Sequence, residues 1–115
     1  MKVTIYHNPR CSKSRQTLAL LEGKGIEPEI VEYLTTPPGR DQLSRILDLL
    51  NLKARDLMRR KEAVYQEKGL DDAALTEAQL IEAMIENPIL IERPIVLANG
   101  KAAIGRPPEN VLDIL

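Results

Sequence analysis

The only cysteine of the chain, Cys11, is its strongest candidate for chemistry. It lies in the segment YHNPRCSKSR, residues 6–15, between an expected strand and the first turn of an expected helix. A thiol at that position faces unpaired N–H groups and the positive end of the helix dipole, which favour the thiolate. Arg10, Lys13 and Arg15 add positive charge nearby. The pattern predicts a nucleophilic thiolate, and the alternative is a buried, inert cysteine that packs as a small hydrophobic residue.

The residue three positions after Cys11 is Ser14, so the motif is Cys-x-x-Ser. A second thiol at that position would resolve a covalent adduct within the same chain. With serine there, an adduct on Cys11 has to be resolved by a thiol from outside the protein. The spacing therefore predicts a one-cysteine mechanism that depends on an external thiol.

Three arginines lie at boundaries of expected elements, where ligand-facing side chains are common. They are Arg59, Arg93 and Arg106. Arg93 precedes an expected strand, and Arg106 follows an expected hairpin. Position alone assigns them no ligand, because an isolated arginine is most often a solvated surface charge.

The first elements that must position these residues can be read from hydrophobic spacing. Residues 2–6 alternate apolar and polar side chains, which indicates a short strand. Residues 12–22 have apolar side chains at helical spacing and are followed by Gly25, a typical residue just beyond a helix. Residues 29–34 form a second expected strand. This order predicts a βαβ unit with parallel strands.

The middle of the chain is predicted to be helical. After the break at Pro37-Pro38-Gly39, apolar residues recur at helical spacing over residues 43–50. A shorter helix is expected over residues 54–61. A third is expected to begin at a capping box around Thr76 and to end at Asn87-Pro88.

The C-terminal part predicts a hairpin and a helix. Residues 95–98 and 101–104 flank Asn99-Gly100, which is typical of a type I′ hairpin turn. Pro107-Pro108 is predicted to open a terminal helix that ends at Leu115.

The order βαβ, helices, ββα predicts an α/β fold. We interpret residues 1–115 as a single thioredoxin-like domain with a helical insertion between its two halves, and 115 residues suit one hydrophobic core. Arg93-Pro94 stands just before the third strand, where that fold characteristically holds a cis proline.

Composition excludes several classes of protein. Sixteen Lys and Arg against seventeen Asp and Glu give a net charge of −1, so the basic excess typical of nucleic-acid or anionic-membrane binding is missing. No apolar run approaches the ~20 residues of a transmembrane helix, and no signal-peptide pattern is present. One cysteine and one histidine cannot build a zinc site alone. We expect a cytoplasmic protein with no bound metal or cofactor.

The sequence resembles the glutaredoxin-dependent arsenate reductase family along its whole length. The motifs that carry the resemblance are Ile5-Tyr6-His7-Asn8-Pro9 with Cys11, Ser14-Arg15, Thr17-Leu18, Tyr33-Leu34, Pro37-Pro38, Leu57 with Arg59, Asn87-Pro88-Ile89-Leu90-Ile91, Arg93-Pro94-Ile95-Val96, Gly105-Arg106-Pro107 and Val111-Leu112-Asp113-Ile114-Leu115. The chain looks like a short branch of this family that lacks a C-terminal extension. It departs from the reductases at Arg10 and at Ser12-Lys13, where they often carry a small residue and Gly-Thr.

The resemblance implies how a substrate would be bound. Cys11 would be the nucleophile that takes arsenate, or a similar oxyanion, as a thiol–arsenate adduct. The oxyanion would be held by guanidinium groups, whose planar fork suits its shape. These groups belong to Arg59, Arg93 and Arg106.

The resemblance also implies roles around the cysteine. His7 would be a second catalytic residue that helps to keep Cys11 ionised, and the alternative is a hydrogen-bonded turn residue. Asn8 and Ser14 would order the loop and complete the substrate-binding set.

The partners implied by the resemblance are two external thiols. Glutathione would be the reductant that attacks the adduct, and glutaredoxin would remove the mixed disulfide. Two alternatives stay open. One is a glutathione-linked thiol oxidoreductase with another substrate, such as protein mixed disulfides. The other is a Spx-like regulator that binds RNA polymerase, although the Spx redox switch is Cys-x-x-Cys and this chain has Ser14 instead.

Overall fold

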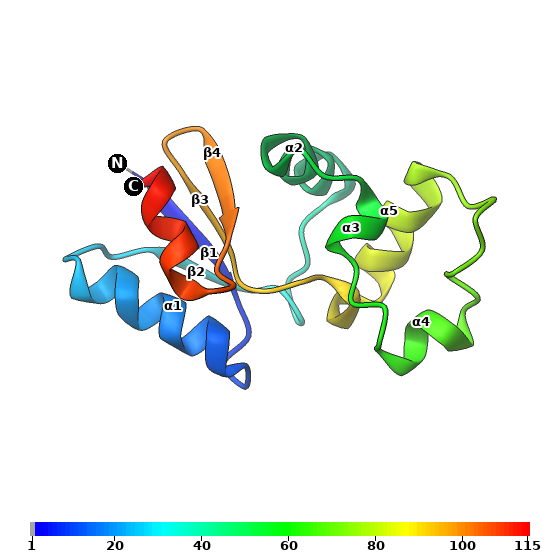
Figure 1. Cartoon of the computed structure of the whole chain (residues 1–115), viewed down its shortest axis with the longest axis horizontal. Helices are drawn as coiled ribbons and strands as arrows, with labels where there is room; N and C mark the ends of the chain where they lie inside the picture. Colours follow the sequence, from blue (N-terminus) through cyan, green and yellow to red (C-terminus); the bar gives the residue numbers. More distant parts are fainter. Residues whose placement is uncertain (1) are drawn as a thin grey trace. The chain divides into compact units, whose positions relative to one another are not determined.

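The computed structural model describes residues 2–115, and Figure 1 shows the order of its elements. Four strands form one sheet in the order β2-β1-β3-β4: β1 (Val3–His7), β2 (Glu29–Glu32), β3 (Ile95–Ala98) and β4 (Lys101–Ile104). The helices are α1 (Ser12–Gly23), α2 (Arg40–Leu50), α3 (Ala54–Leu57), α4 (Ala63–Glu67) and α5 (Glu77–Glu86), with two 3₁₀ helices, η1 (Pro88–Leu90) and η2 (Pro108–Ile114). No helix within residues 2–115 is both long and apolar enough to cross a membrane.

The chain is organised in two compact units. Residues 37–92 form one unit, which contains α2 to α5 and η1. The described residues on either side of this segment form the other unit, which contains the whole sheet together with α1 and η2. The predicted α/β order, a βαβ half and a ββα half around a helical insertion, is confirmed. Whether the chain behaves as the single domain predicted over residues 1–115 stays a prediction.

The sheet is built around β1, which has a neighbour on each side. It pairs in parallel with β2, so that Ile5 lies opposite Ile30, and this confirms the predicted βαβ unit. On its other side β1 pairs antiparallel with β3, so that Ile5 also lies opposite Val96. β3 then pairs antiparallel with β4 through the hairpin. The C-terminal end of β1, the beginning of β3 and the end of β4 therefore lie at the same end of the sheet.

The hydrophobic core of the sheet unit lies between one face of the sheet and two helices, α1 and η2, which Figure 1 shows in blue and red. Its buried residues come from two strands, β1 and β3, and from both helices: Val3, Ile5, Leu21, Val96, Ala98, Val111 and Ile114. All are aliphatic, in keeping with the absence of Phe and Trp from the sequence. Burial of this aliphatic surface supplies most of the free energy that fixes α1 on the sheet.

The C-terminal end of α1 follows the sequence prediction. Gly25 has φ +76°, in the left-handed region that favours glycine. Its N–H bonds to the carbonyl of Glu22, and the N–H of Ile26 bonds to the carbonyl of Leu21. This pair of hydrogen bonds is a Schellman motif, which satisfies carbonyls that the helix leaves open.

The structure differs from the prediction at several boundaries. The short helix predicted over 54–61 ends at Leu57, because Met58 takes an extended conformation and pairs with Ile91. The unpredicted α4 is only five residues long and buries one of them, Tyr65, so its sequence carries little periodic signal. The terminal helix is a 3₁₀ helix, with bonds such as that from Asn110 N to Pro107 O.

The hairpin between β3 and β4 has the predicted turn. Asn99 and Gly100 have φ +54° and +72°, the left-handed values that a type I′ turn requires. The Asn99 side-chain amide also donates to the carbonyl of Ile114 at 2.9 Å. The same residue thus shapes the turn and ties it to the end of η2.

Substitution of Asn99 is expected to separate these two contributions. Asn99→Gly keeps the left-handed conformation and loses only the hydrogen bond, so the free energy of unfolding should fall by about 1 kcal/mol. Asn99→Ala also strains the turn and should lose about 2 kcal/mol or more. Urea unfolding of the three proteins measures both values. Equal losses in the two variants would show that the turn conformation does not matter.

Candidate active site

Cys11 follows a tight turn that joins β1 to α1. The N–H of Cys11 donates to the carbonyl of Asn8 at 3.0 Å, and the Asn8 side-chain oxygen accepts from the N–H of Arg10 at 3.0 Å. Asn at the first position of a turn and Pro9 at the second are the residues that such a turn favours. Cys11 is the N-cap of α1, and its carbonyl accepts from the N–H of Arg15. The sequence therefore places the sulfur at the N-terminus of the helix, as predicted.

The side chain of Ser14 is fully buried and makes two polar contacts within this loop. Its hydroxyl oxygen lies 2.6 Å from His7 Nδ1 and accepts from the backbone N–H of Asn8 at 3.0 Å. The end of β1, the turn and the first turn of α1 are thereby held by one oxygen atom. Asn8 and Ser14 both hydrogen-bond within the loop, and their predicted contact with substrate stays a prediction.

His7 is buried, and its ring meets Ser14. Burial lowers the pKa of His7, Glu32 raises it, Arg15 lowers it, and the net pKa lies below the usual value. The imidazole is therefore neutral at pH 7. A neutral ring lends no positive charge to a thiolate, and the predicted role of His7 in keeping Cys11 ionised stays a prediction.

The half-buried thiol of Cys11 is subject to opposing influences. Burial is the largest and raises its pKa. The backbone N–H of Ser14, the Arg93 guanidinium and the backbone N–H of Lys13 lower the pKa, and together they bring it below the ordinary value. Neither N–H makes a capping hydrogen bond of ordinary geometry to the sulfur, so we regard them as aligned dipoles that face it.

The sheet register brings Arg93 and Arg106 to the same end of β1. Tyr6 lies opposite Ile95, and Ile95 lies opposite Ile104, so the residues just outside β3 and β4 meet beside the loop. Arg106 Nε donates to the carbonyl of Arg93 at 2.8 Å, and Arg106 Nη2 lies 3.5 Å from Cys11 Sγ. Both arginines precede a cis proline, Arg93-Pro94 and Arg106-Pro107.

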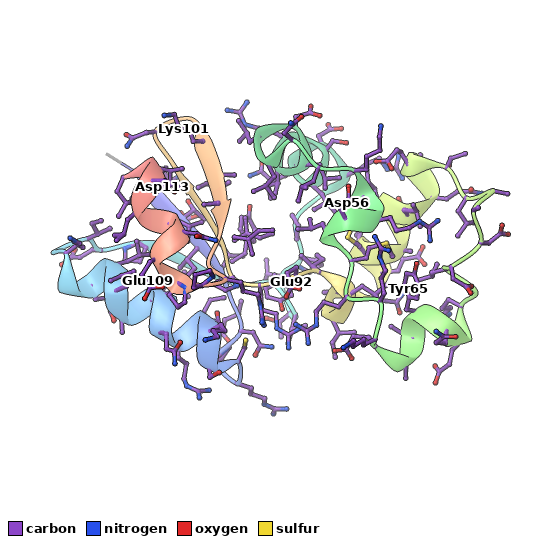
Figure 2. All side chains as sticks on the ribbon, viewed as in Figure 1. Asp56, Tyr65, Glu92, Lys101, Glu109 and Asp113 are labelled. Atoms are coloured by element: carbon purple, nitrogen blue, oxygen red, sulfur yellow. The ribbon has the colours of Figure 1, made fainter. Side chains whose placement is uncertain are left out.

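Arg59 belongs to the unit of residues 37–92 and has two acidic partners there. Its Nε lies 3.3 Å from a Glu62 oxygen, and its Nη1 lies 3.1 Å from a carboxylate oxygen of Glu92, which is labelled in Figure 2. Its backbone N–H donates to the carbonyl of Leu90. Arg59 is therefore held in place, and its predicted role as an oxyanion ligand stays a prediction.

Some of these groups could not be selected from the sequence. Glu62 stands three residues after Arg59, a spacing that could have indicated the ion pair. Glu92 is 33 positions away from Arg59 and gives no local signal. The backbone N–H groups of Lys13 and Ser14 act through the chain geometry, whatever side chain these residues carry.

The arrangement can do two things chemically. A thiolate at a helix N-terminus with a guanidinium beside it is a nucleophile, and the same N–H and guanidinium groups attract an anion. Within the part of the chain that the structure describes, no three His, Cys, Asp or Glu side chains gather as a metal site.

Comparison with known proteins agrees with this geometry. The model of the ArsC family matches residues 6–114. The chain is 58% identical to the uncharacterised protein YfgD of Escherichia coli K12 over 99% of this chain and 97% of that one. It is 52% identical to an arsenate reductase of Neisseria meningitidis serogroup A over 99% and 98% of the two chains. The solved structure of an arsenate reductase from Vibrio cholerae matches with a TM-score of 0.97 and 54% identity, over 100% of this chain and 98% of that one. The chain belongs to the ArsC family.

Proposed function

We propose that this protein is an arsenate reductase, in which Cys11 forms a thiol–arsenate adduct that glutathione and glutaredoxin resolve. The observation that carries the proposal is the cationic thiol site, in which Arg106 Nη2 lies 3.5 Å from Cys11 Sγ and the pKa of Cys11 is lowered. The relatives that are arsenate reductases support the choice of substrate.

The proposed reaction needs only groups that the site holds and two external thiols. The Cys11 thiolate attacks arsenate, an S–As bond forms, and one arsenate oxygen leaves as water after it takes up protons. The glutathione thiolate then attacks the Cys11 sulfur, and the S–As electron pair stays on arsenic, which is reduced from As(V) to As(III) and leaves as arsenite. The two sulfurs are oxidised to a mixed disulfide. A glutaredoxin thiol attacks this disulfide and returns Cys11 to the thiolate.

The one-cysteine motif supports the dependence on outside thiols. Ser14 takes the position that a resolving cysteine would have, and its hydroxyl is already engaged with His7 and Asn8. Arg93 and Arg106 would hold the oxyanion at the thiol in this proposal. Arg59 would be a further ligand, presented by Glu62 and Glu92.

A coupled assay tests the proposed reaction. Purified protein, arsenate, glutathione and glutaredoxin are combined, arsenite release is measured, and each component is omitted in turn. We expect release only when all are present and no detectable turnover by Cys11→Ser, because a serine hydroxyl is a poor nucleophile at neutral pH. A normal circular dichroism spectrum of Cys11→Ser shows that the loss is chemical.

One outcome of the assay would redirect the proposal. If arsenite does not form although iodoacetamide still alkylates Cys11 at pH 7, arsenate is not the substrate. Reduction of a glutathionylated peptide by the same protein would then favour the thiol oxidoreductase alternative.

The guanidinium of Arg93 lowers the pKa of Cys11. In Arg93→Ala the pKa of Cys11 should rise, and alkylation of Cys11 at pH 7 should slow by about threefold or more, since thiolate falls tenfold per unit of pKa. Arg45→Ala removes an exposed arginine of α2 and is the matched control. Equal alkylation rates in the two variants would show that Arg93 does not stabilise the thiolate.

His7, the only histidine of the chain, provides a test by pH titration. Burial lowers its pKa, so a ¹H NMR titration of the ring should give a midpoint below the usual 6.5. The unfolded chain then binds a proton more readily than the folded protein, so stability should fall as pH drops below about 6.5. His7→Asn should remove this part of the pH dependence. A midpoint at or above 6.5 would contradict the prediction, and only a midpoint above 7 would mean that most His7 rings are charged at pH 7 and can act on Cys11 directly.

A further inference from the structure

Two residues of the sequence motifs, Thr17 and Gly105, have no role in the chemistry described so far. They are 88 positions apart, yet the Thr17 hydroxyl lies 3.5 Å from the carbonyl oxygen of Gly105. Thr17 is fully buried on α1, and Gly105 is buried just beyond β4. We call this close approach of α1 and the end of β4 the Thr17–Gly105 contact.

The contact leaves no space for a side chain at position 105. A Cβ atom on Gly105 would lie 2.4 Å from Thr17 Oγ1, 2.8 Å from Pro94 Cγ and 3.1 Å from Thr17 Cγ2. Cβ atoms essentially never come within 3.0 Å of such neighbours. The other five glycines have nothing within 4 Å of the same position. Gly105 has no left-handed φ, so its need for glycine comes from packing alone.

Hydrogen bonds connect both residues of the contact to the elements that hold the thiol site. On one side, the Thr17 hydroxyl donates to the carbonyl of Lys13, in the first turn of the helix that Cys11 caps. On the other side, the N–H of Gly105 donates to the carbonyl of Pro94 at 2.9 Å. Gly105 is therefore hydrogen-bonded to the residue that follows Arg93, and it immediately precedes Arg106 in the chain.

Both arginines are attached to the segment that contains Gly105. Arg106 follows Gly105 in the chain, and its Nε is bound to the carbonyl of Arg93, which precedes Pro94. Arg106 Nη2 lies 3.5 Å from Cys11 Sγ, within hydrogen-bonding distance of sulfur. Because Arg106 follows Gly105 and is hydrogen-bonded to Arg93, we expect a displacement of the end of β4 away from α1 to carry these guanidinium groups away from the thiol.

We propose that the Thr17–Gly105 contact sets the distance between the Cys11 sulfur and the Arg93–Arg106 pair, which makes Thr17 and Gly105 positioning residues of the thiol site. The Thr17 side chain limits how closely α1 can approach the end of β4. The absence of a side chain on Gly105 allows this close approach. The inference rests on the proposed function only in taking Cys11 as the reacting thiol.

The test measures thiol reactivity, which requires neither arsenate nor glutathione. The rate of alkylation of Cys11 by iodoacetamide is followed from pH 5 to pH 10 in the full-length protein and gives the pKa of the thiol. In Gly105→Ala the pKa of Cys11 should rise, and the rate at pH 7 should fall about threefold or more. Gly23→Ala adds the same methyl group where nothing lies within 4 Å, and its profile should match the unaltered protein.

A second variant distinguishes an effect on the position of the two arginines from a general loss of packing. Thr17→Ala combined with Gly105→Ala removes two of the three atoms that the new methyl group would meet. The double variant should regain part of the lost reactivity, although it lacks the Thr17 hydroxyl, because only the 2.8 Å approach to Pro94 Cγ remains. A general packing defect would instead worsen with the second truncation.

Three outcomes would overturn the proposal. The first is a folded Gly105→Ala protein with an unchanged thiol profile, and the second is a double variant that regains nothing. The third is failure of both variants to fold, which would assign the contact to the fold rather than to the site. Failure of arsenate turnover in the unaltered protein would count against the proposed function and would leave this comparison valid.

Discussion

Burial of the Cys11 thiol is the constraint on which the site depends. Burial raises the pKa of the sulfur more than any other single influence changes it, so the surrounding groups have to act together to bring it below the ordinary value. The helix N-terminus supplies the N–H groups of Lys13 and Ser14, and Arg93 supplies a full charge. No one of these donors outweighs burial by itself. The lowered pKa of Cys11 is therefore a property of the assembled loop and sheet end rather than of the local motif.

This dependence explains why the sequence predicted some parts of the site and not others. The position of Cys11 at the start of α1 follows from a strand, the turn at Asn8-Pro9 and a helix, all of which are local signals. The approach of Arg106 to the sulfur depends on strand order and register, which bring residues 95 positions apart together. Spacing alone could mark Arg93 and Arg106 as boundary residues, and only the resemblance to a family could connect them with Cys11.

In the fold, too, features set by local sequence were predictable, and features set by distant contacts were not. Gly25 and the Asn99-Gly100 turn were predictable because a left-handed φ selects particular residues. The early end of α3 was not, because it depends on the pairing of Met58 with Ile91, a distant partner. Gly105 has an ordinary φ. Glycine is required at this position because a Cβ atom would collide with Thr17 and Pro94. Nothing in its sequence neighbourhood distinguishes a glycine required for space from one required for conformation.

The serine of Cys-x-x-Ser is more than a missing second thiol. Ser14 is fully buried, and its oxygen lies 2.6 Å from His7 and 3.0 Å from the Asn8 nitrogen. A thiol at that position would be larger and would hydrogen-bond weakly, so it would disturb the contacts that join β1, the turn and α1. The hydroxyl that orders the loop thus occupies the place from which a resolving cysteine would act. In the proposed reaction, a site that uses this residue to present Cys11 therefore takes its second thiol from another molecule.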